Sequence, residues 1–217
     1  SRGSFVGAGV RVDSNSAFSA VAFKGKNPEG EYLLIEQPES SGLLMEYKKS
    51  FLNAQFSLQT GLLSEPKGFL GSSVGGAFGS IDSSDTLFSG LQIFHESDNF
   101  YTTGSLFYGK TDTNFKERGL ISSLDNFKSS SFSVGIFLKK GFGEFDSFGF
   151  QVEQPLRLEE GRMDLSVPVG RTKYRKVLFQ DYSIDITPSG RELDFKLIHN
   201  WPFSSGIISS RIGFVKD

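Results

Sequence analysis

The chain has 217 residues, of which 37% are hydrophobic and 22% charged, with a formal net charge of −2 and no cysteine. A near-neutral charge gives no electrostatic basis for binding nucleic acid, and the absence of cysteine excludes disulfides and thiolate zinc sites. The apolar runs are far shorter than the roughly 20 residues of a membrane-spanning helix, and no signal peptide is predicted at the start of the chain.

Apolar and polar residues alternate along most of the chain, a pattern typical of β-strands, and no helical periodicity of useful length appears. Clusters of Gly, Pro, Asn, Asp and Ser separate the alternating runs and indicate short turns. The runs indicate about 12 strands at regular spacing, and no change in composition marks a second domain. We therefore predict a single domain over residues 1–217, the C-terminal part of a longer precursor. The clearest runs are residues 4–12, 53–63, 86–96, 131–140, 148–153, 191–203 and 206–217.

The stretch QVEQPLRLEEGRMDLSVPVGR, residues 151–171, alternates on both sides of Glu159-Glu160-Gly161, which predicts a hairpin that turns there. Proline cannot donate a hydrogen bond to a ladder, so Pro155 and Pro168 are expected at strand ends or bulges near one rim. The longest connections are expected near residues 25–30, 36–42, 112–128 and 171–178.

The run at residues 131–140 separates two kinds of side chain: Phe132, Val134, Ile136 and Leu138 lie on one face, opposite Ser133, Gly135 and Lys139. Runs of this length exceed the roughly 5 to 6 residues usual in soluble strands and fit the roughly 9 to 11 of a membrane strand. A polar face rich in Gly, Ser, Thr, Gln and Asn fits a narrow lumen.

These features predict an all-β, antiparallel, closed transmembrane β-barrel of about 12 strands. Closure would pair the first run with the last, with Phe5 to Val12 antiparallel to Ile207 to Val215. A soluble secreted β-sandwich for binding or adhesion, with a Phe-rich core, would show the same alternation and remains the alternative.

The candidates for chemistry are few. His95 and His199 are the only histidines, and neither stands in a metal-binding or catalytic pattern. The Gly-rich stretch GSSVGGAFGS lacks the lysine and helix of a phosphate-binding loop. No catalytic, cofactor-binding or metal-ligating residue is therefore predicted, although an outer-membrane barrel hydrolase that uses His95 or His199 is a third hypothesis.

Two segments, EQPLRLEEGRMDLSVPVG and ITPSGRELDFKLIHNWPFSSGIISSRIGFVKD, resemble the C-terminal barrel of bacterial autotransporters. They are most similar to the barrel of subtilisin-type autotransporter serine peptidases of alphaproteobacteria, and the resemblance covers about the last 90 residues. The chain departs from that pattern because it has no peptidase passenger and no aromatic residue at its end. The matching positions are Gln154, Pro155, Leu156, Arg157, Pro168, Val169, Gly170, Ser189, Gly190, Arg191 and Glu192.

The resemblance implies a location in the outer membrane of a Gram-negative bacterium. It also implies a role in anchoring an N-terminal passenger and helping to export it, with no reaction carried out by this chain. The implied partners are outer-membrane lipid, the chain's own N-terminal passenger or linker, and the barrel-assembly machinery. Nucleic acid is not among them.

Overall fold

The computed structural model describes residues 2–26, 39–69, 76–140, 143, 146–203 and 206–216. These residues form eleven β-strands and one short 3₁₀ turn, Gly76–Phe78. The strands are β1 Arg2–Asp13, β2 Ser16–Lys26, β3 Glu39–Phe51, β4 Ala54–Pro66, β5 Gly79–Glu96, β6 Phe100–Arg118, β7 Ile121–Lys139, β8 Ser147–Arg171, β9 Val177–Asp185, β10 Leu193–Phe203 and β11 Gly206–Lys216.

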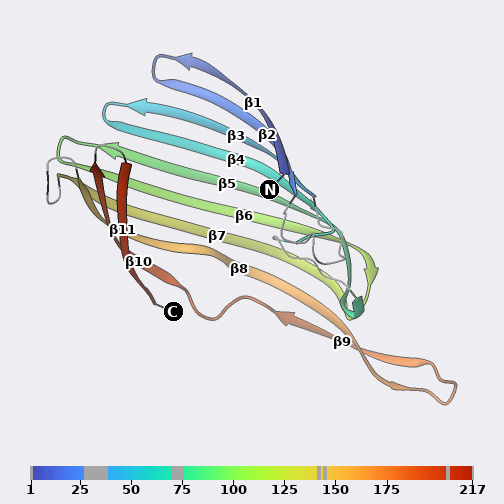
Figure 1. Ribbon diagram of the computed structural model, residues 1–217. Coiled ribbons are helices and arrows are strands. Elements are labelled where there is room, and N and C mark those ends of the chain that lie inside the picture. Colours follow the sequence, from blue (N-terminus) through green and yellow to red (C-terminus); the bar gives the residue numbers. More distant parts are fainter. Residues whose placement is uncertain are drawn as a thin grey trace.

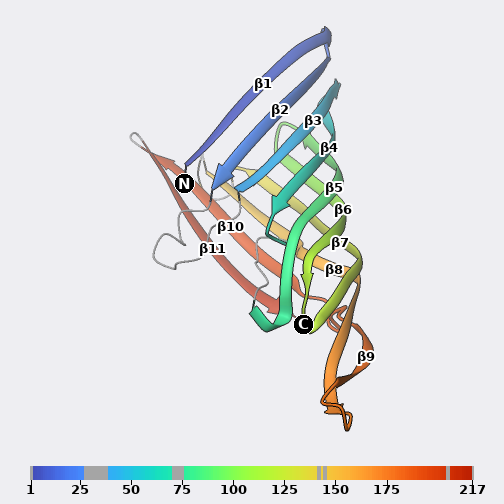
Figure 2. The ribbon, with the colours of Figure 1, turned by 90° about the vertical axis from the view of Figure 1, so that its right-hand side faces the viewer.

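All eleven strands belong to one sheet, and every pairing in it is antiparallel. Consecutive strands are neighbours from β1 to β8, after which the sheet continues through β10 to β11, while β9 pairs with β8 alone. The sheet is strongly curved, as Figure 2 shows. The predicted all-β antiparallel fold is therefore confirmed, as one sheet.

The described part of the sheet is open, because β1 and β11 are its two edges and do not pair with each other (Figure 1). The predicted ladder between Phe5–Val12 and Ile207–Val215 is thus absent from this structure. Edge strands leave backbone groups unpaired, so the open edges are the least satisfied part of the sheet.

Two predicted connections are wrong. β8 runs without interruption through Glu159–Gly161, and the hairpin turns instead at residues 172–176. The predicted loop at residues 112–128 is mostly strand, because β6 and β7 extend to a turn at residues 119–120. Both segments carry the charges and glycine that mark loops, yet pairing with neighbouring strands, with several shifts of register, keeps them extended. Of the predicted loops at 25–30 and 36–42, residues 27–30 and 36–38 lie outside the described residues, whereas residues 25–26 belong to β2 and residues 39–42 to β3.

The two prolines of β8 lie at irregularities of its ladders. The pairing with β7 shifts between Gln154 and Arg157, around Pro155, and the pairing with β9 shifts between Pro168 and Gly170. The expectation that each proline belongs at a bulge is confirmed. They do not share a rim, because Pro155 lies near the middle of β8.

The inner face of the sheet is packed by phenylalanine rings over glycines. Each strand has two rows of side chains, one on each face of the sheet. Side chains are more crowded on the concave face of a curved sheet, so the less exposed row of each strand marks the inner face. On this face four Phe–Gly pairs stand directly opposite each other on neighbouring strands, and a Cβ on any of these glycines would overlap the ring. Such pairs pin the register of a curved sheet. They are Phe23–Gly42, Phe88–Gly61, Phe107–Gly90 and Phe137–Gly149.

A small hydrophobic core lies where β5 to β8 extend past their shorter neighbours. Ile81, Ile121, Leu124 and Phe127 are buried there, and Phe69 packs edge-on against Phe127 with ring centroids 4.5 Å apart. These strands have 18 to 25 residues, well above the roughly 9 to 11 that cross a bilayer. The extended ends therefore form a separately packed region beyond the main wall.

Candidate functional site

The outward face of the sheet carries an apolar band. On β7 the side chains of Val134, Ile136 and Leu138 are 60%, 49% and 50% exposed, while Gly135 and Phe137 between them are buried. Every strand on the path from β1 to β11 contributes to this band. Its exposed members are Val6, Val10, Val12, Phe18, Leu43, Tyr47, Phe56, Leu58, Leu62, Leu87, Ile93, Leu106, Tyr108, Val134, Ile136, Leu138, Phe150, Leu197, Trp201, Ile208, Ile212 and Phe214.

Polar side chains of the inner face bind one another across strands. The Glu46 carboxylate accepts hydrogen bonds from Ser57 Oγ at 2.6 Å and from Gln59 Nε2 at 2.9 Å. Further along the same face, Ser105 and Ser133 hydroxyls lie 3.0 Å apart. Polar groups shielded from bulk water need such partners, and these inner-face residues supply them to one another.

Charged residues of the inner face are also paired. Lys196 on β10 forms an ion pair with Glu153 on β8 and lies 3.3 Å from the Asp194 carboxylate. Lys48 lies 3.0 Å from Glu46 in the same way. Lysines therefore supply the cations of these ion pairs, and each has a carboxylate on the same face as its counter-charge.

The apolar band has an upper limit on the long strands. Along the outward rows of β7 and β8 the run of apolar residues stops at Phe132 and Val152, where Ser130 and Gln154 follow. Charged pairs lie farther toward the extended ends. Lys128 Nζ lies 2.6 Å from the Glu160 carboxylate, and Lys110 lies 3.2 Å from Asp112. The surface thus changes from apolar to charged within one sheet.

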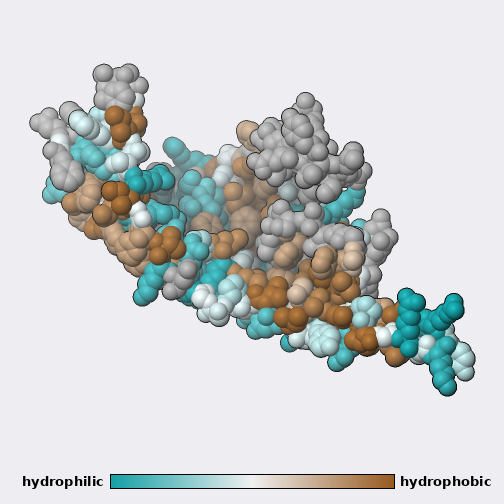
Figure 3. All heavy atoms as spheres, turned by 60° about the horizontal axis from the view of Figure 1, so that its bottom comes forward, coloured by the Kyte–Doolittle hydropathy of each residue, from teal (hydrophilic) through white to brown (hydrophobic). Residues whose placement is uncertain are grey.

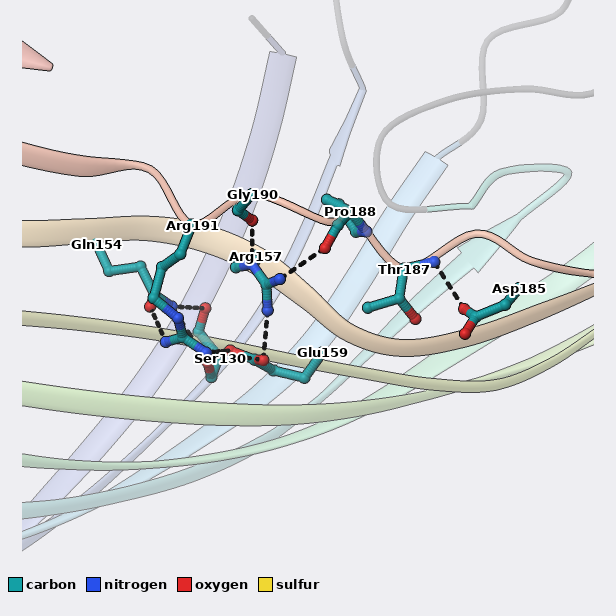
Figure 4. Close-up of polar contacts among 9 residues, drawn as sticks. All are labelled: Ser130, Gln154, Arg157, Glu159, Asp185, Thr187, Pro188, Gly190 and Arg191. Carbon is teal, nitrogen blue, oxygen red and sulfur yellow. Dashed lines mark hydrogen bonds and ion pairs between the residues drawn. The ribbon is translucent and has the colours of Figure 1, made fainter. Parts of the chain in front are cut away.

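A polar clasp, defined here as Ser130, Gln154, Arg157, Glu159 and Arg191, lies just beyond this limit (Figure 4). It occupies the part of β8 between its pairing with β10, which ends at Glu153, and its pairing with β9, which starts at Arg162. The chain between β9 and β10 passes along this uncovered edge. Side chains of the clasp take the place of the missing ladder.

Two guanidinium groups converge on one carboxylate in the clasp. Arg157 Nη1 donates to Glu159 at 2.5 Å, and Arg191 Nη2 donates to the same carboxylate at 3.1 Å. Arg157 also donates to the carbonyl oxygens of Gly190 at 3.0 Å and Pro188 at 2.7 Å. Charge-assisted hydrogen bonds of this kind fix geometry strongly, so the clasp fastens the β9–β10 connection to β8.

The clasp joins the two separate segments on which the resemblance to autotransporter barrels depends. Gln154 and Arg157 of the first segment bind Arg191 and Gly190 of the second, 33 to 37 positions away. The third matching group, Pro168-Val169-Gly170, lies apart from them in the β8–β9 hairpin. The sequence contained all these residues, but not their contact, which depends on the break in the β8 ladder.

Removal of the clasp carboxylate is expected to destabilise the fold. In the Glu159→Gln variant the partly buried guanidinium of Arg157 and the more exposed one of Arg191 lose their counter-charge, which should lower the free energy of unfolding by about 1.5 to 3 kcal/mol. Urea unfolding followed by circular dichroism would measure the change. The Glu160→Gln variant is the matched control, because Glu160 binds only the exposed Lys128 and should cost below about 1 kcal/mol. Equal effects of the two variants would contradict the role of the clasp.

The stabilities of the wild type and of the Glu159→Gln variant should also depend differently on pH. A hydrogen bond from Ser130, helped by Arg191 and Arg157, holds the pKa of Glu159 below its ordinary value of 4.5. A lowered pKa means that the ionised carboxylate stabilises the fold above that ordinary value, and that this contribution is lost as the pH falls through the folded value. The stability difference between the wild type and Glu159→Gln should therefore shrink as the pH is lowered from about 6 to about 3.

The two histidines occupy different places. His95 lies near the end of β5, tilted against Phe100 with ring centroids 6.0 Å apart. His199 Nε2 lies 2.9 Å from the carboxylate of Asp146, a buried residue whose other oxygen accepts a hydrogen bond from the Gly143 amide. Sequence reasoning missed the His199–Asp146 pair because 53 positions separate the residues and no motif links them. The pair ties the β7–β8 turn to β10.

No protein-family model, curated protein or solved structure matches this chain. Within the described residues, no helix has the length and hydropathy to cross a membrane. Membership of the autotransporter family consequently stays a prediction that depends on the motif residues themselves.

Proposed function

We propose that this chain is a β-barrel domain of a Gram-negative outer membrane, which anchors an N-terminal passenger and helps to export it. It carries out no reaction of its own, and its partners are lipid, the passenger or its linker, and the machinery that assembles barrels. The observation that carries the membrane role is the apolar band, present on the outward face of every strand from β1 to β11 apart from β9.

Exposure of the whole apolar band to water would be unfavourable. Soluble monomers rarely expose contiguous apolar patches above a few hundred Å², and each Å² withdrawn from water contributes about 25 cal/mol. A bilayer would cover this band while the paired polar residues face inward, which is the arrangement of transmembrane barrels. A β-sandwich would bury the same rows between two packed sheets, whereas the described strands form one sheet.

Closure of the sheet belongs to this proposal. Unpaired backbone amides cost several kcal/mol in lipid, so β1 and β11 would join there. The path from β1 to β11 contains ten strands, an even number, so its two edge strands run antiparallel and can pair as neighbours in a ring do. Gly9 and Gly213 both belong to inner-facing rows and bring no side chain between the two edges.

The passenger role is supported more indirectly, by the resemblance of the clasp segments to autotransporter barrels. A hollow lined by paired polar groups has room for at most a linker, since small barrels fill their interior with side chains.

Detergent dependence tests the membrane role. The chain should be folded and monodisperse in detergent micelles or a bilayer, and should aggregate when the detergent is removed, because the band is then exposed to water. Sedimentation velocity and circular dichroism would report both states. A folded monomer in plain buffer would instead favour a soluble binding domain.

Disulfide crosslinking tests closure. The chain has no cysteine, so the Gly9→Cys and Gly213→Cys substitutions introduce the only thiols. In bilayers this pair, or one of its neighbours in a scan of positions 5–12 against 207–215, should crosslink under mild oxidation. Pairs with one partner on β5, far from either edge, serve as the control. Failure of the whole scan, with rapid amide exchange on β1, would show that the sheet stays open.

A further inference from the structure

The hairpin made by the distal half of β8 and by β9 leaves the wall of the sheet. Its ladder runs from the Arg162–Asp185 pair to the Arg171–Val177 pair, and β9 has no second neighbour among the described strands. It extends past the ends of the other strands (Figure 1), and in the perpendicular view it lies outside the curve of the sheet (Figure 2). A two-stranded hairpin is marginally stable alone in water, so this one needs a supporting surface.

The hairpin has two unlike faces. One face bears the opposed pairs Met163–Ile184 and Leu165–Tyr182, and the other bears Arg162–Asp185, Asp164–Ser183 and Ser166–Asp181. The base of the apolar face packs against the small hydrophobic core through Met163 and Leu165. Farther out the apolar side chains lose this cover: Leu178 is 47% exposed, and Val169 at the bulge is 54% exposed. Phe179, opposite Pro168 on the other face, is 60% exposed.

The tip of the hairpin is a fixed cationic turn. Arg171, Lys173, Arg175 and Lys176 stand within six positions, and none of them forms an ion pair with another described residue. The Thr172 amide donates to the Lys176 carbonyl at 2.8 Å, and the Arg175 amide donates to the Thr172 carbonyl at 2.9 Å. Tyr174 at the centre of the turn is 93% exposed. Figure 3 shows this end of the molecule as its hydrophilic extremity.

We propose that this hairpin binds the phosphate-bearing headgroups of an anionic lipid surface, with the cations on the phosphates and the exposed apolar residues at the acyl boundary. An amphipathic element with exposed aromatics and clustered Lys and Arg is the usual composition of an interfacial anchor. Its position past the strand ends and outside the curve of the sheet keeps it clear of the other strands, so its tip is free to meet such a surface.

Nucleic acid fits the hairpin less well, although it is also anionic. Asp164, Asp181 and Asp185 line the polar face below the tip. A long polyanion laid along the hairpin would meet these carboxylates, whereas a compact headgroup meets the tip alone. This inference goes beyond the proposed barrel function, because a barrel can span a membrane without such a hairpin.

Headgroup contact can be measured with one label. The chain has no cysteine, so Gln180→Cys provides a unique site for a fluorophore on the hairpin. The labelled chain would be reconstituted in nanodiscs of phosphatidylcholine, with or without about 30% phosphatidylglycerol, and with a headgroup-linked quencher. Quenching should be strong in the anionic discs, weak in the neutral ones, and reversed by about 1 M salt, which screens exposed charges beyond about 3 Å.

Charge variants identify the residues responsible. Each cation near an anionic surface contributes roughly fivefold to binding, so the Lys173→Gln/Lys176→Gln double variant should lower the ratio of bound to free hairpin about 30-fold. The Lys49→Gln/Lys216→Gln double variant removes the same charge elsewhere and should leave the ratio unchanged. The proposal is overturned if the two double variants give the same ratio of bound to free hairpin, or if quenching is equally strong in the anionic and neutral discs.

Two further outcomes are informative. A single-stranded DNA oligonucleotide that displaces the hairpin from the anionic discs at equal phosphate concentration would overturn the proposal in favour of nucleic acid. If the chain instead stays monomeric in plain buffer, the barrel proposal fails but the hairpin remains testable: the same proteins would be sedimented with anionic and neutral vesicles. Selective sedimentation with the anionic vesicles, lost in the tip variant, would then support the hairpin alone.

Discussion

The Ile136→Arg variant is expected to fold poorly into a bilayer, with a loss of about 2 to 4 kcal/mol in folding free energy. Ile136 is 49% exposed, lies between Val134 and Leu138 in the outward row of β7, and stands opposite Phe150 on β8. A guanidinium there would enter hydrocarbon if the band faces lipid. Urea titration of the protein folded in phospholipid vesicles would measure the loss.

The control substitution is at Asp112, outside the apolar band on the neighbouring strand β6. Asp112→Arg adds the same guanidinium to an exposed position beside Lys110 and should change the folding free energy by less than about 1 kcal/mol. If instead Ile136→Arg folds as well as Asp112→Arg, in vesicles and in plain buffer, the outward band faces water. The membrane role would then lose the observation that carries it.

The Gly149→Ala variant is expected to be destabilised by about 3 kcal/mol. A methyl group at position 149 would overlap the ring of Phe137, which stands directly opposite on β7. That ring is 7% exposed and stacks on Tyr101 with centroids 4.7 Å apart, so it has little room to move. Denaturant unfolding in detergent micelles would measure the loss.

A double-mutant cycle isolates the cause. In the Phe137→Ala background, itself expected to cost about 3 to 5 kcal/mol, the methyl group meets no ring and Gly149→Ala should be nearly neutral. Gly104→Ala on β6 is the matched control, because nothing lies within 4 Å of a Cβ at that position. It should be neutral or slightly stabilising, since Ala limits the unfolded chain more than Gly does. A large cost at Gly104, or no rescue by Phe137→Ala, would contradict ring–glycine packing as the device that fixes register.

Together these variants probe the two faces of one wall. The outward row reports the solvent that surrounds the sheet, and the inner Phe–Gly pairs report the packing that curves it. A membrane barrel requires both results, whereas a soluble sheet requires only the second.

Much of the fold follows from the sequence alone. Alternation has a period of two, so it assigned Phe132, Val134, Ile136 and Leu138 to one face and Ser133 and Gly135 to the other, as the structure has them. The bulges around Pro155 and Pro168 were also predictable, because proline has no amide hydrogen for a ladder. Such features depend on local chemistry, which a sequence states directly.

Other features were decided only by tertiary structure. Glu159-Glu160-Gly161 reads as a turn, but it stays in strand, paired with β7 through Glu160. The two arginines that neutralise Glu159 come from β8 itself and from the β9–β10 connection. Lys128, which the sequence places in a loop, is likewise held in β7 opposite Glu160. Neither outcome can be predicted from the local sequence. Arg191, which binds Glu159, and Lys128, which binds Glu160, each lie about 30 positions or more away from that partner along the chain. The physical reason is that a strand is stable only through its neighbours, so the choice between strand and turn depends on which segments meet in space.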